Sequence, residues 1–385
     1  MNSPKPSLNI SVNPTMDSKL QYRIAFASIR GMNVTLAGEI IRLVGSEREF
    51  FQASETRLRY LTQSKSRIYD DEYRAKILAE AANEVSFIKK NSIRPVYFTD
   101  PDYPTRLLQC NDAPILMYAI GDLDLNAARI VGIVGTRHAT IYGIEFTKKL
   151  IEDLARKVDN LIIVSGLAYG IDITAHRAAV ASNTPTVAVM ATGLNTVYPA
   201  DHRADASEIV RRGGLLLTEH RNGEPIHKGN FVARNRIVAG LIDCLVVVES
   251  AERGGALITA ELASEYNRDV FALPGRISDS YSAGCNKLIA SQLAGLIQNA
   301  DDLCRAMRWP VNGQTLNESP TLPIELNPEE SIIVNFLDKN EDASLQQLTI
   351  ETGFPISKLM SILIDMEFRG IILALPGGRY RKTAN

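Results

Sequence analysis

The sequence predicts an α/β protein with a Rossmann-like, doubly wound parallel sheet, a small helical domain before it and a winged helix after it. Between residues 129 and 307, short apolar runs alternate with helical segments, as in a parallel sheet covered by helices. Residues 17–90 show only helical, amphipathic patterns. Residues 328–385 combine three helical segments with two short strands around a glycine turn, which is typical of a winged helix.

The first two predicted strands each end in a glycine turn. Glycine there lets a ligand phosphate approach the backbone, and the following helix N-terminus adds N–H donors and partial positive charge. An arginine in the first turn suits the same ligand, so the two turns together favour an anion. Neither turn has the spacing of a P-loop or a dinucleotide fingerprint, which disfavours both of those classes. The turns hold Gly135, Thr136 and Arg137 after the run 129–134, and Ser165, Gly166 and Gly170 after the run 161–164.

The remaining strands and helices of the sheet domain alternate regularly along the chain. Six alternations describe a doubly wound sheet, whose ligand is expected beyond the carboxyl ends of the strands. Further strands are expected at 186–191, 215–218, 244–249 and 270–273, and helices at 142–158 and near 201–212, 232–241, 255–267 and 285–294.

The sequence divides into six parts. Residues 1–16 are polar and are expected to be a disordered tail, while 91–128 form a connecting segment of short strands and proline turns. The helical domain, 17–90, resembles a SAM or helix-hairpin-helix domain; it could hold a DNA backbone, but we favour protein contacts because its cations are not concentrated. A polar linker, 308–327, leads from the sheet domain (129–307) to the winged helix (328–385). Its recognition-helix candidate, Ser357–Arg369, is acidic, so we favour protein contacts or weak binding over specific duplex recognition.

Composition limits the classes of function. The 42 Lys and Arg against 44 Asp and Glu leave a formal charge of −2, so any nucleic-acid site must be a local basic patch. No apolar run reaches membrane-spanning length and no signal peptide is evident, which predicts a soluble cytoplasmic protein. The four cysteines are scattered, so neither a disulfide framework nor a zinc site is expected; they are Cys110, Cys244, Cys285 and Cys304.

Two titratable residues follow the second glycine turn, Asp172 and His176. A lone histidine in such a helix is more often a structural group, and a carboxylate early in a helix is favoured by capping and the helix dipole. No Ser-His-Asp set or metal cluster is assembled by spacing. We therefore expect no catalytic residues, no metal and no cofactor.

The segment 226–236 carries the clearest nucleic-acid signal. It combines Lys228, Phe231, Arg234 and Arg236 with two asparagines. An aromatic ring beside cations is typical of sites for single-stranded nucleic acid, because a base stacks on the ring while the phosphates contact the cations. Alternatively, the phenylalanine anchors the loop in the core and the arginines pair with acids such as Asp172, Asp243 or Glu249. We expect both to hold in part, with one arginine bracing the site internally.

Several motifs together resemble the DNA-processing protein A (DprA, or Smf) family. They lie at 135–137, 165–176, 198–199, 231–237, 257–260, 273–275 and 284–289, in the order of that family. The resemblance implies binding of single-stranded DNA, a homodimer formed through the Rossmann-like domain, and protection and RecA loading of incoming DNA during natural transformation and recombination. It also implies a DNA-binding site made of Gly135, Thr136, Arg137, Ser165, Gly166, Gly170, Lys228, Phe231, Arg234, Asn235, Arg236 and Asn286.

Two departures from the family pattern concern hydroxyl groups. The usual Ser-Glu pair is Thr218-Glu219, which keeps the hydroxyl, whereas the usual Ser-Gly-Ser/Thr-Leu turn is Gly254-Gly255-Ala256-Leu257, which loses both. An alternative function also rests on this region. Residues 249–261 faintly resemble the motif of nucleoside-monophosphate phosphoribohydrolase-like enzymes, although the proline and third glycine of that motif are missing. Release of adenine from AMP would distinguish the two.

Overall fold

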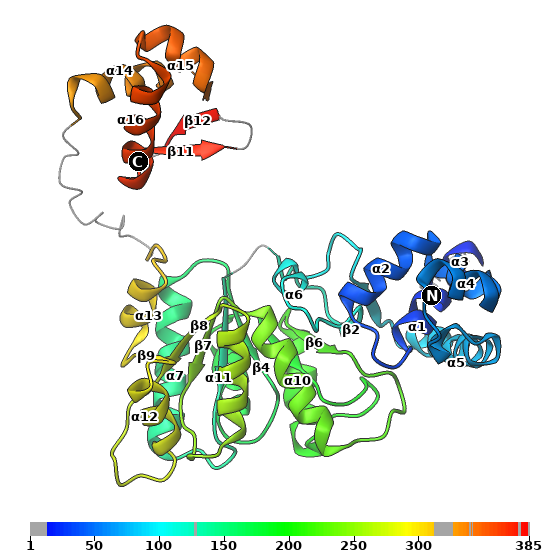
Figure 1. Cartoon of the computed structure of the whole chain (residues 1–385). Helices are drawn as coiled ribbons and strands as arrows, with labels where there is room; N and C mark the ends of the chain where they lie inside the picture. The colour runs from blue at the N-terminus through cyan, green and yellow to red at the C-terminus, as the bar shows by residue number, and fades with distance from the viewer. Residues whose placement is uncertain are drawn as a thin grey trace, which may run out of the picture. The chain divides into compact units, whose positions relative to one another are not determined.

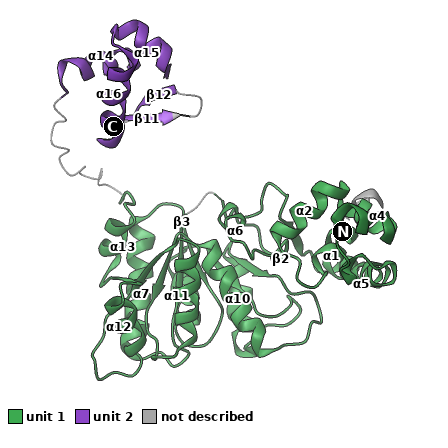
Figure 2. Ribbon diagram, in the orientation of Figure 1, with its two compact units in different colours: residues 1–314 green, residues 315–385 purple. Residues whose placement is uncertain are grey.

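The computed structural model describes residues 14–126, 129–311, 326–338, 340, 342–375 and 379–383. Most of the expected tail and most of the expected linker therefore lie outside the described residues. The chain forms two compact units, residues 1–314 and residues 315–385 (Figure 2).

A nine-stranded sheet is the centre of the first unit, in the order β1-β2-β6-β5-β4-β3-β7-β8-β9 (Figure 1). From β3 the chain moves outward through β4, β5 and β6, and then returns to β7 on the other side of β3. This confirms the doubly wound sheet and puts its topological switch point between β3 and β7. The parallel strands are β3 (Arg129–Val134), β4 (Leu161–Ser165), β5 (Thr186–Val189), β6 (Leu215–Thr218), β7 (Cys244–Val247), β8 (Asp269–Ala272) and β9 (Gly295–Leu296).

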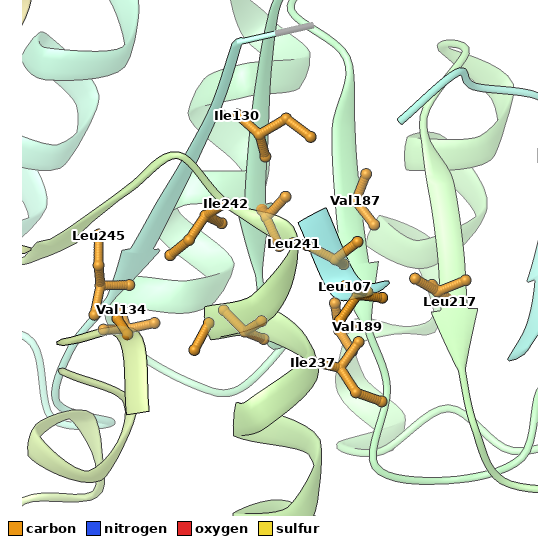
Figure 3. Packing of buried hydrophobic residues seen from close by; sticks show 14 of the residues in the cluster. Leu107, Ile130, Val134, Val187, Val189, Leu217, Ile237, Leu241, Ile242 and Leu245 are labelled. Carbon is orange, nitrogen blue, oxygen red and sulfur yellow. The ribbon is translucent and has the colours of Figure 1, made fainter. Parts of the chain in front are cut away.

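Helices cover both faces of the parallel sheet, which explains why its strands are apolar throughout rather than alternating. In β3, Ile130 and Val134 enter the core on one face, while Val131 and Ile133 enter the core on the other. Figure 3 shows the first of these cores, where Ile237 of α10 packs among strand residues. The helices α10 (Lys228–Leu241), α11 (Gly255–Glu265) and α12 (Ala283–Ala290) pack into the first core, and α7 (Ile141–Lys157), α8 (Ile171–Ala181) and α13 (Ala300–Ala306) into the second.

The stretch 91–128, expected to be only a connection, contributes two strands to the sheet. β1 (Arg94–Tyr97) pairs with β2 (Leu116–Ile120), and β2 pairs antiparallel with β6. Strands this short, separated by proline turns and α6 (Thr105–Leu108), give little periodicity from which the pairing could be predicted.

The N-terminal helices pack against this antiparallel extension. Phe26 and Phe50 lie in one apolar cluster with Tyr97, Leu116 and Tyr118 of β1 and β2. The helical segment therefore shares a core with the edge of the sheet. Its helices are α1 (Pro14–Ala27), α2 (Val34–Val44), α3 (Glu47–Gln52), α4 (Glu55–Thr62) and α5 (Asp71–Lys90). No described helix is both long and apolar enough to cross a membrane.

The second unit has the helices and strands of a winged helix, as expected. Leu348, Leu359 and Leu363 are fully buried in a core of its own. Capping boxes at Asn327 and Ser344 satisfy the first backbone N–H groups of two of its helices. The elements are α14 (Pro328–Leu337), β10 (Ala343–Ser344), α15 (Leu345–Thr352), α16 (Ile356–Phe368), β11 (Ile372–Leu375) and β12 (Arg379–Lys382), with the strands in the order β10-β12-β11.

Candidate nucleic-acid interface

A cavity of about 330 Å³ opens at the carboxyl ends of β3 and β7, where the topology changes direction. Ligands of doubly wound sheets bind at this point, because the loops diverge there and leave a crevice. We call it the switch-point cleft. Its lining includes Gly135, Thr136, Arg137, His138, Ala168, Asp172, Phe231, Arg234, Asn235, Ser250, Gly254, Gly255 and Thr259.

Arg137 and Phe231 meet at this cleft. The Cζ atom of Arg137 lies 5.7 Å from the centroid of the Phe231 ring, within the range of a cation–π contact. Arg137 is exposed and forms no ion pair with any described residue. The Phe231 ring also packs edge-on against Tyr198, with the two centroids 5.3 Å apart. Phe231 belongs to none of the buried apolar clusters among the described residues, so it does not anchor its loop in the core.

Arg234 is the arginine that braces the site. It is 5% exposed, and its Nη1 donates to the carbonyl oxygens of Val189, at 2.6 Å, and Gly166. A Cβ at residue 166 would overlap this guanidinium, so glycine is needed for Arg234 to enter. Burial lowers the pKa of Arg234, while the charge of Asp172 opposes that shift. Arg234 thus holds the ends of β4 and β5, and its donors are used inside the protein.

The other turn residues also serve the fold. Ser165 is fully buried, and its hydroxyl donates to Ile133 O at 2.6 Å. Gly170 has a φ of +74°, and a Cβ there would overlap the carbonyl oxygen of Thr136. The backbone N–H of Thr136 donates to Glu249 O at 2.7 Å. These contacts fix the turn that presents Arg137.

The helix N-termini of the two glycine turns are not free, contrary to the sequence-based expectation. The carboxylate of Glu249 accepts from the backbone N–H of Thr140, at 2.9 Å, and from its hydroxyl, so it occupies the start of α7. At the start of α8, the N–H of Ile171 donates to Thr136 O at 3.2 Å. A buried carboxylate already supplies the negative charge that the α7 dipole favours.

The helix start that faces the cleft belongs instead to α11. Its N-cap, Gly254, makes no side-chain capping bond, and Gly254, Gly255 and Ala256 all line the cleft. The two hydroxyls missing from this turn are therefore missing from the cleft itself. Ser250 and Thr259 add hydroxyl-bearing side chains to the same lining.

Asp172 and His176 are structural groups in this arrangement. Burial raises the pKa of Asp172, although the charge of Arg234 works in the opposite direction. Burial also lowers the pKa of His176 to about 3. The Nδ1 of His176 lies 2.8 Å from the hydroxyl of Thr186, which itself donates to Ile163 O. His176 does not line the cleft.

The remaining residues of the expected site are spread more widely. Lys228 is exposed at the first position of α10 and lies outside the cleft lining. Arg236 faces a different cavity, of about 830 Å³, and pairs with Glu219 rather than with Asp172, Asp243 or Glu249. Asn235 lines the cleft, and its side-chain oxygen accepts from Arg234 Nε at 3.2 Å.

Asn286 is a loop-holding residue. Its Nδ2 donates to Gly275 O at 2.9 Å, and its Oδ1 accepts from Gly275 N at 3.2 Å. It does not line the cleft. Among the residues that the structure describes, no group of three or more His, Cys, Asp or Glu side chains is placed to hold a metal ion.

Family models match most of this architecture. The model described as DNA recombination-mediator protein A matches residues 94–308, more than half of the chain. The chain belongs to the DprA/Smf family. A second model, the DprA winged helix domain, matches residues 317–378.

Individual DprA/Smf proteins resemble the chain over long stretches. Protein Smf of Synechocystis is 32% identical over 78% of this chain and 83% of its own length. DNA processing protein DprA of Streptococcus pneumoniae is 41% identical over 53% of this chain and 71% of its own length. The X-ray structure of that pneumococcal DprA has a TM-score of 0.60 and 30% identity, covering 75% of this chain and 97% of its own.

A further similar structure concerns the single-stranded DNA binding mode of DprA from Helicobacter pylori. It has a TM-score of 0.51 and 29% identity to this chain. The likeness covers 56% of this chain and 95% of the Helicobacter chain.

Sequence reasoning did not identify every residue at the cleft of this DprA/Smf protein. Tyr198, which packs on Phe231, is predicted only as part of the motif 198–199, and the sequence pattern predicts no role for His138. The His138 ring stacks on Tyr281, which comes from the loop after β8. Aromatic residues close to glycine turns were the available signal, but their partners lie far away in the sequence.

Proposed function

We propose that this DprA/Smf protein binds single-stranded DNA without strong sequence preference at the switch-point cleft. The observation that carries the proposal is Arg137, which is exposed, unpaired with described acids, and placed over the half-buried ring of Phe231. A phosphate beside the guanidinium and a base against the ring would satisfy both groups. Every base has a π face, so such a site tolerates any sequence.

The start of α11 supports the same ligand. The N–H of its N-cap, Gly254, donates to Ala251 O at 3.0 Å, so Gly255 and Ala256 present the helix start to the cleft without a side-chain cap. The helix dipole favours an anion there. The single-stranded DNA binding mode of the similar Helicobacter protein is consistent with this ligand. Lys228 is exposed at the start of α10, on the element that carries Phe231, and would meet a neighbouring phosphate.

Binding without chemical change of the DNA is part of the proposal. His176 is fully buried and lies outside the cleft lining. Asp172 lines the cleft but is only 6% exposed, and its carboxylate accepts from the backbone N–H of Ala168 and faces the charge of Arg234, so we assign it a structural role. The rival phosphoribohydrolase function has less support, because Glu249 is held by Thr140 at the start of α7. Incubation with AMP is expected to release no adenine, and adenine release would favour the enzyme.

The wider biological function is also proposed. The names of the pneumococcal and Bacillus subtilis relatives refer to DNA processing. We infer that this protein protects incoming single strands and loads RecA on them during transformation, acting as a homodimer joined through its Rossmann-like domain. The family resemblance supports these steps; the geometry of the cleft supports the DNA contact alone.

The binding test compares single-stranded with duplex DNA at several salt concentrations. Arg137→Ala is expected to weaken single-strand binding for all sequences and to reduce the salt slope by about 0.7, the value for one released counterion. Phe231→Ala is expected to cost about 1–3 kcal/mol if a base stacks on the ring. Arg57→Ala is the control, since Arg57 is exposed on α4 and its loss changes net charge equally. Unchanged affinity in both cleft variants would place the DNA elsewhere.

A further inference from the structure

A second aromatic pair lies beside the switch-point cleft. His138 follows Arg137 directly and lines the cleft, and its ring stacks on Tyr281 with centroids 6.3 Å apart and planes inclined by 28°. The other pair, Phe231 with Tyr198, has centroids 5.3 Å apart. Both pairs therefore adjoin the residue proposed to meet a phosphate.

The order of the strands puts the two pairs on opposite sides of Arg137. Tyr198 follows β5, and Tyr281 follows β8. Arg137 follows β3, and the sheet order β5-β4-β3-β7-β8 places β3 between them. A chain of nucleotides crossing the carboxyl edge of the sheet at Arg137 would thus leave one aromatic pair and approach the other.

The loop that carries Tyr281 is held in place at both ends. The backbone N–H of Ser250, itself in the cleft lining, donates to Tyr281 O at 2.7 Å. Gly284 N donates to Ser250 O at 2.8 Å, which fixes the start of α12 to the same residue. At the other end, the side-chain amide of Asn286 binds both backbone groups of Gly275. The loop is therefore preorganised for a ligand.

The chemistry of this loop repeats that of the start of α10. There, Lys228 is exposed three residues before Phe231 on the same helix. Here, Arg276 is exposed and forms no ion pair with a described residue, and Tyr281 supplies the aromatic ring. Ile277, the residue after Arg276, is 97% exposed, which adds apolar surface to the same loop. A cation next to an aromatic ring is the combination that tracks single strands.

We propose that the loop between β8 and α12 is a second wall of the binding site, where His138 and Tyr281 stack a nucleotide and Arg276 meets its phosphate. The single strand then crosses Arg137 between two aromatic pairs. This inference rests on the proposed binding of single-stranded DNA and specifies the path of that strand. Asn286 acts in it as a positioning residue for the loop.

The test measures full-length protein on a long oligothymidylate and on a trinucleotide. Tyr281→Ala is expected to weaken binding of the long strand roughly 5- to 100-fold, as for loss of one stacked base. Tyr281→Phe keeps the ring and is expected to bind as wild type. Tyr60→Ala is the control for loss of an exposed tyrosine, since Tyr60 is 74% exposed on α4.

Additivity distinguishes two walls from one. On the long strand, the losses from Phe231→Ala and Tyr281→Ala are expected to multiply, because the two rings hold different nucleotides. On the trinucleotide, which offers fewer nucleotides to the two walls, Tyr281→Ala is expected to add little to the loss caused by Phe231→Ala. Arg276→Ala is expected to flatten the salt slope on the long strand only.

The outcomes separate this inference from the proposed function. If wild type binds no single-stranded DNA, the proposed function itself fails. If Arg137→Ala loses binding while Tyr281→Ala and His138→Ala bind the long strand as wild type, the second wall is wrong and the cleft stands. Equal melting temperatures of the variants exclude misfolding as the cause of a loss.

Discussion

Two arginines of the cleft show how burial decides the role of a residue. Arg234 is 5% exposed, and its Nη1 donates hydrogen bonds to Gly166 O and Val189 O. Arg137 is exposed and lies over Phe231, with no described acid as a partner. Since a phosphate must compete with existing partners, Arg137 is the better ligand for it. The sequence predicted that one arginine of the pair Arg234 and Arg236 would brace the site; Arg234 does so, and Arg236 also pairs internally, with Glu219.

Some residues at this site could not be predicted because their partners are distant. Glu249 lies two residues after the end of β7. Its carboxylate nevertheless accepts a hydrogen bond from the backbone N–H of Thr140, 109 positions earlier, at the start of α7. His138 and Tyr281 likewise come from loops on different strands. Spacing in the sequence carries no information about such pairs. Arg137 and Phe231 were predicted because each carries its own chemical signal beside a strand or helix end.

A prediction at the residue scale concerns Gly170. Its φ of +74° disfavours any side chain, and a Cβ would also overlap the backbone oxygen of Thr136. Gly213 offers a matched control, because its φ is +79° and a Cβ there meets open space. Gly213→Ala is expected to cost about 1 kcal/mol of unfolding free energy, the usual penalty for that backbone conformation. Gly170→Ala is expected to cost clearly more.

Urea denaturation at neutral pH measures both glycine variants. The excess cost at Gly170 is expected to come with weaker DNA binding, because Thr136 must shift and it precedes Arg137. Equal losses of stability for the two variants would contradict the predicted overlap.

At the scale of elements, the parallel strands were predicted closely and the sheet edges were not. β6 occupies 215–218 as expected, and β5 and β7 end two residues before their predicted ends. Such strands are buried on both faces, so their apolar runs are unmistakable. β1 and β2 were not assigned to the sheet, because they join it only through the antiparallel pairing of β2 with β6, which is distant in the sequence. β9, with two residues, gives no periodic signal.

The winged helix has few cations that are free of ion pairs among its described residues. Most of its described cations pair with its own acids: Lys358 with Glu329, Arg369 with Glu330, Arg379 with Asp342, and Lys382 with Asp338. The recognition helix α16 exposes apolar side chains instead, with Phe368 93% and Ile364 60% exposed. Duplex binding needs free cations for phosphates, so this surface is poorly suited to it.

At the scale of the whole molecule, the sheet determines which truncation is informative. The sheet domain predicted from the sequence, residues 129–307, is the first fragment to consider for a test of DNA binding. However, the sheet includes β1 and β2, and a chain that starts at residue 129 would leave the β6 edge unpaired. Ending at residue 307 would also remove Trp309 from a buried cluster. The appropriate fragment is residues 1–311.

We expect the fragment 1–311 to stay folded and to keep most of the single-strand affinity. The cleft residues all lie within it, and the acidic third helix of the winged helix is absent from it. Thermal melting and fluorescence anisotropy with single-stranded DNA measure the two properties. Complete loss of binding in a fragment that still melts cooperatively would move the main DNA surface into residues 315–385.

The final prediction concerns RecA and follows from the number of clefts on one particle. A homodimer would carry two clefts, and linked sites gain affinity through effective concentration without any new contact. Such a particle could hold an extended strand while RecA assembles on it. ATP hydrolysis by RecA on DNA coated with single-strand-binding protein is therefore expected to rise when this protein is added. Arg137→Ala should abolish the rise at concentrations where the variant no longer binds DNA, whereas Arg57→Ala should preserve it. Tight single-strand binding by wild type without any acceleration of RecA would leave protection of the strand as the function of the cleft.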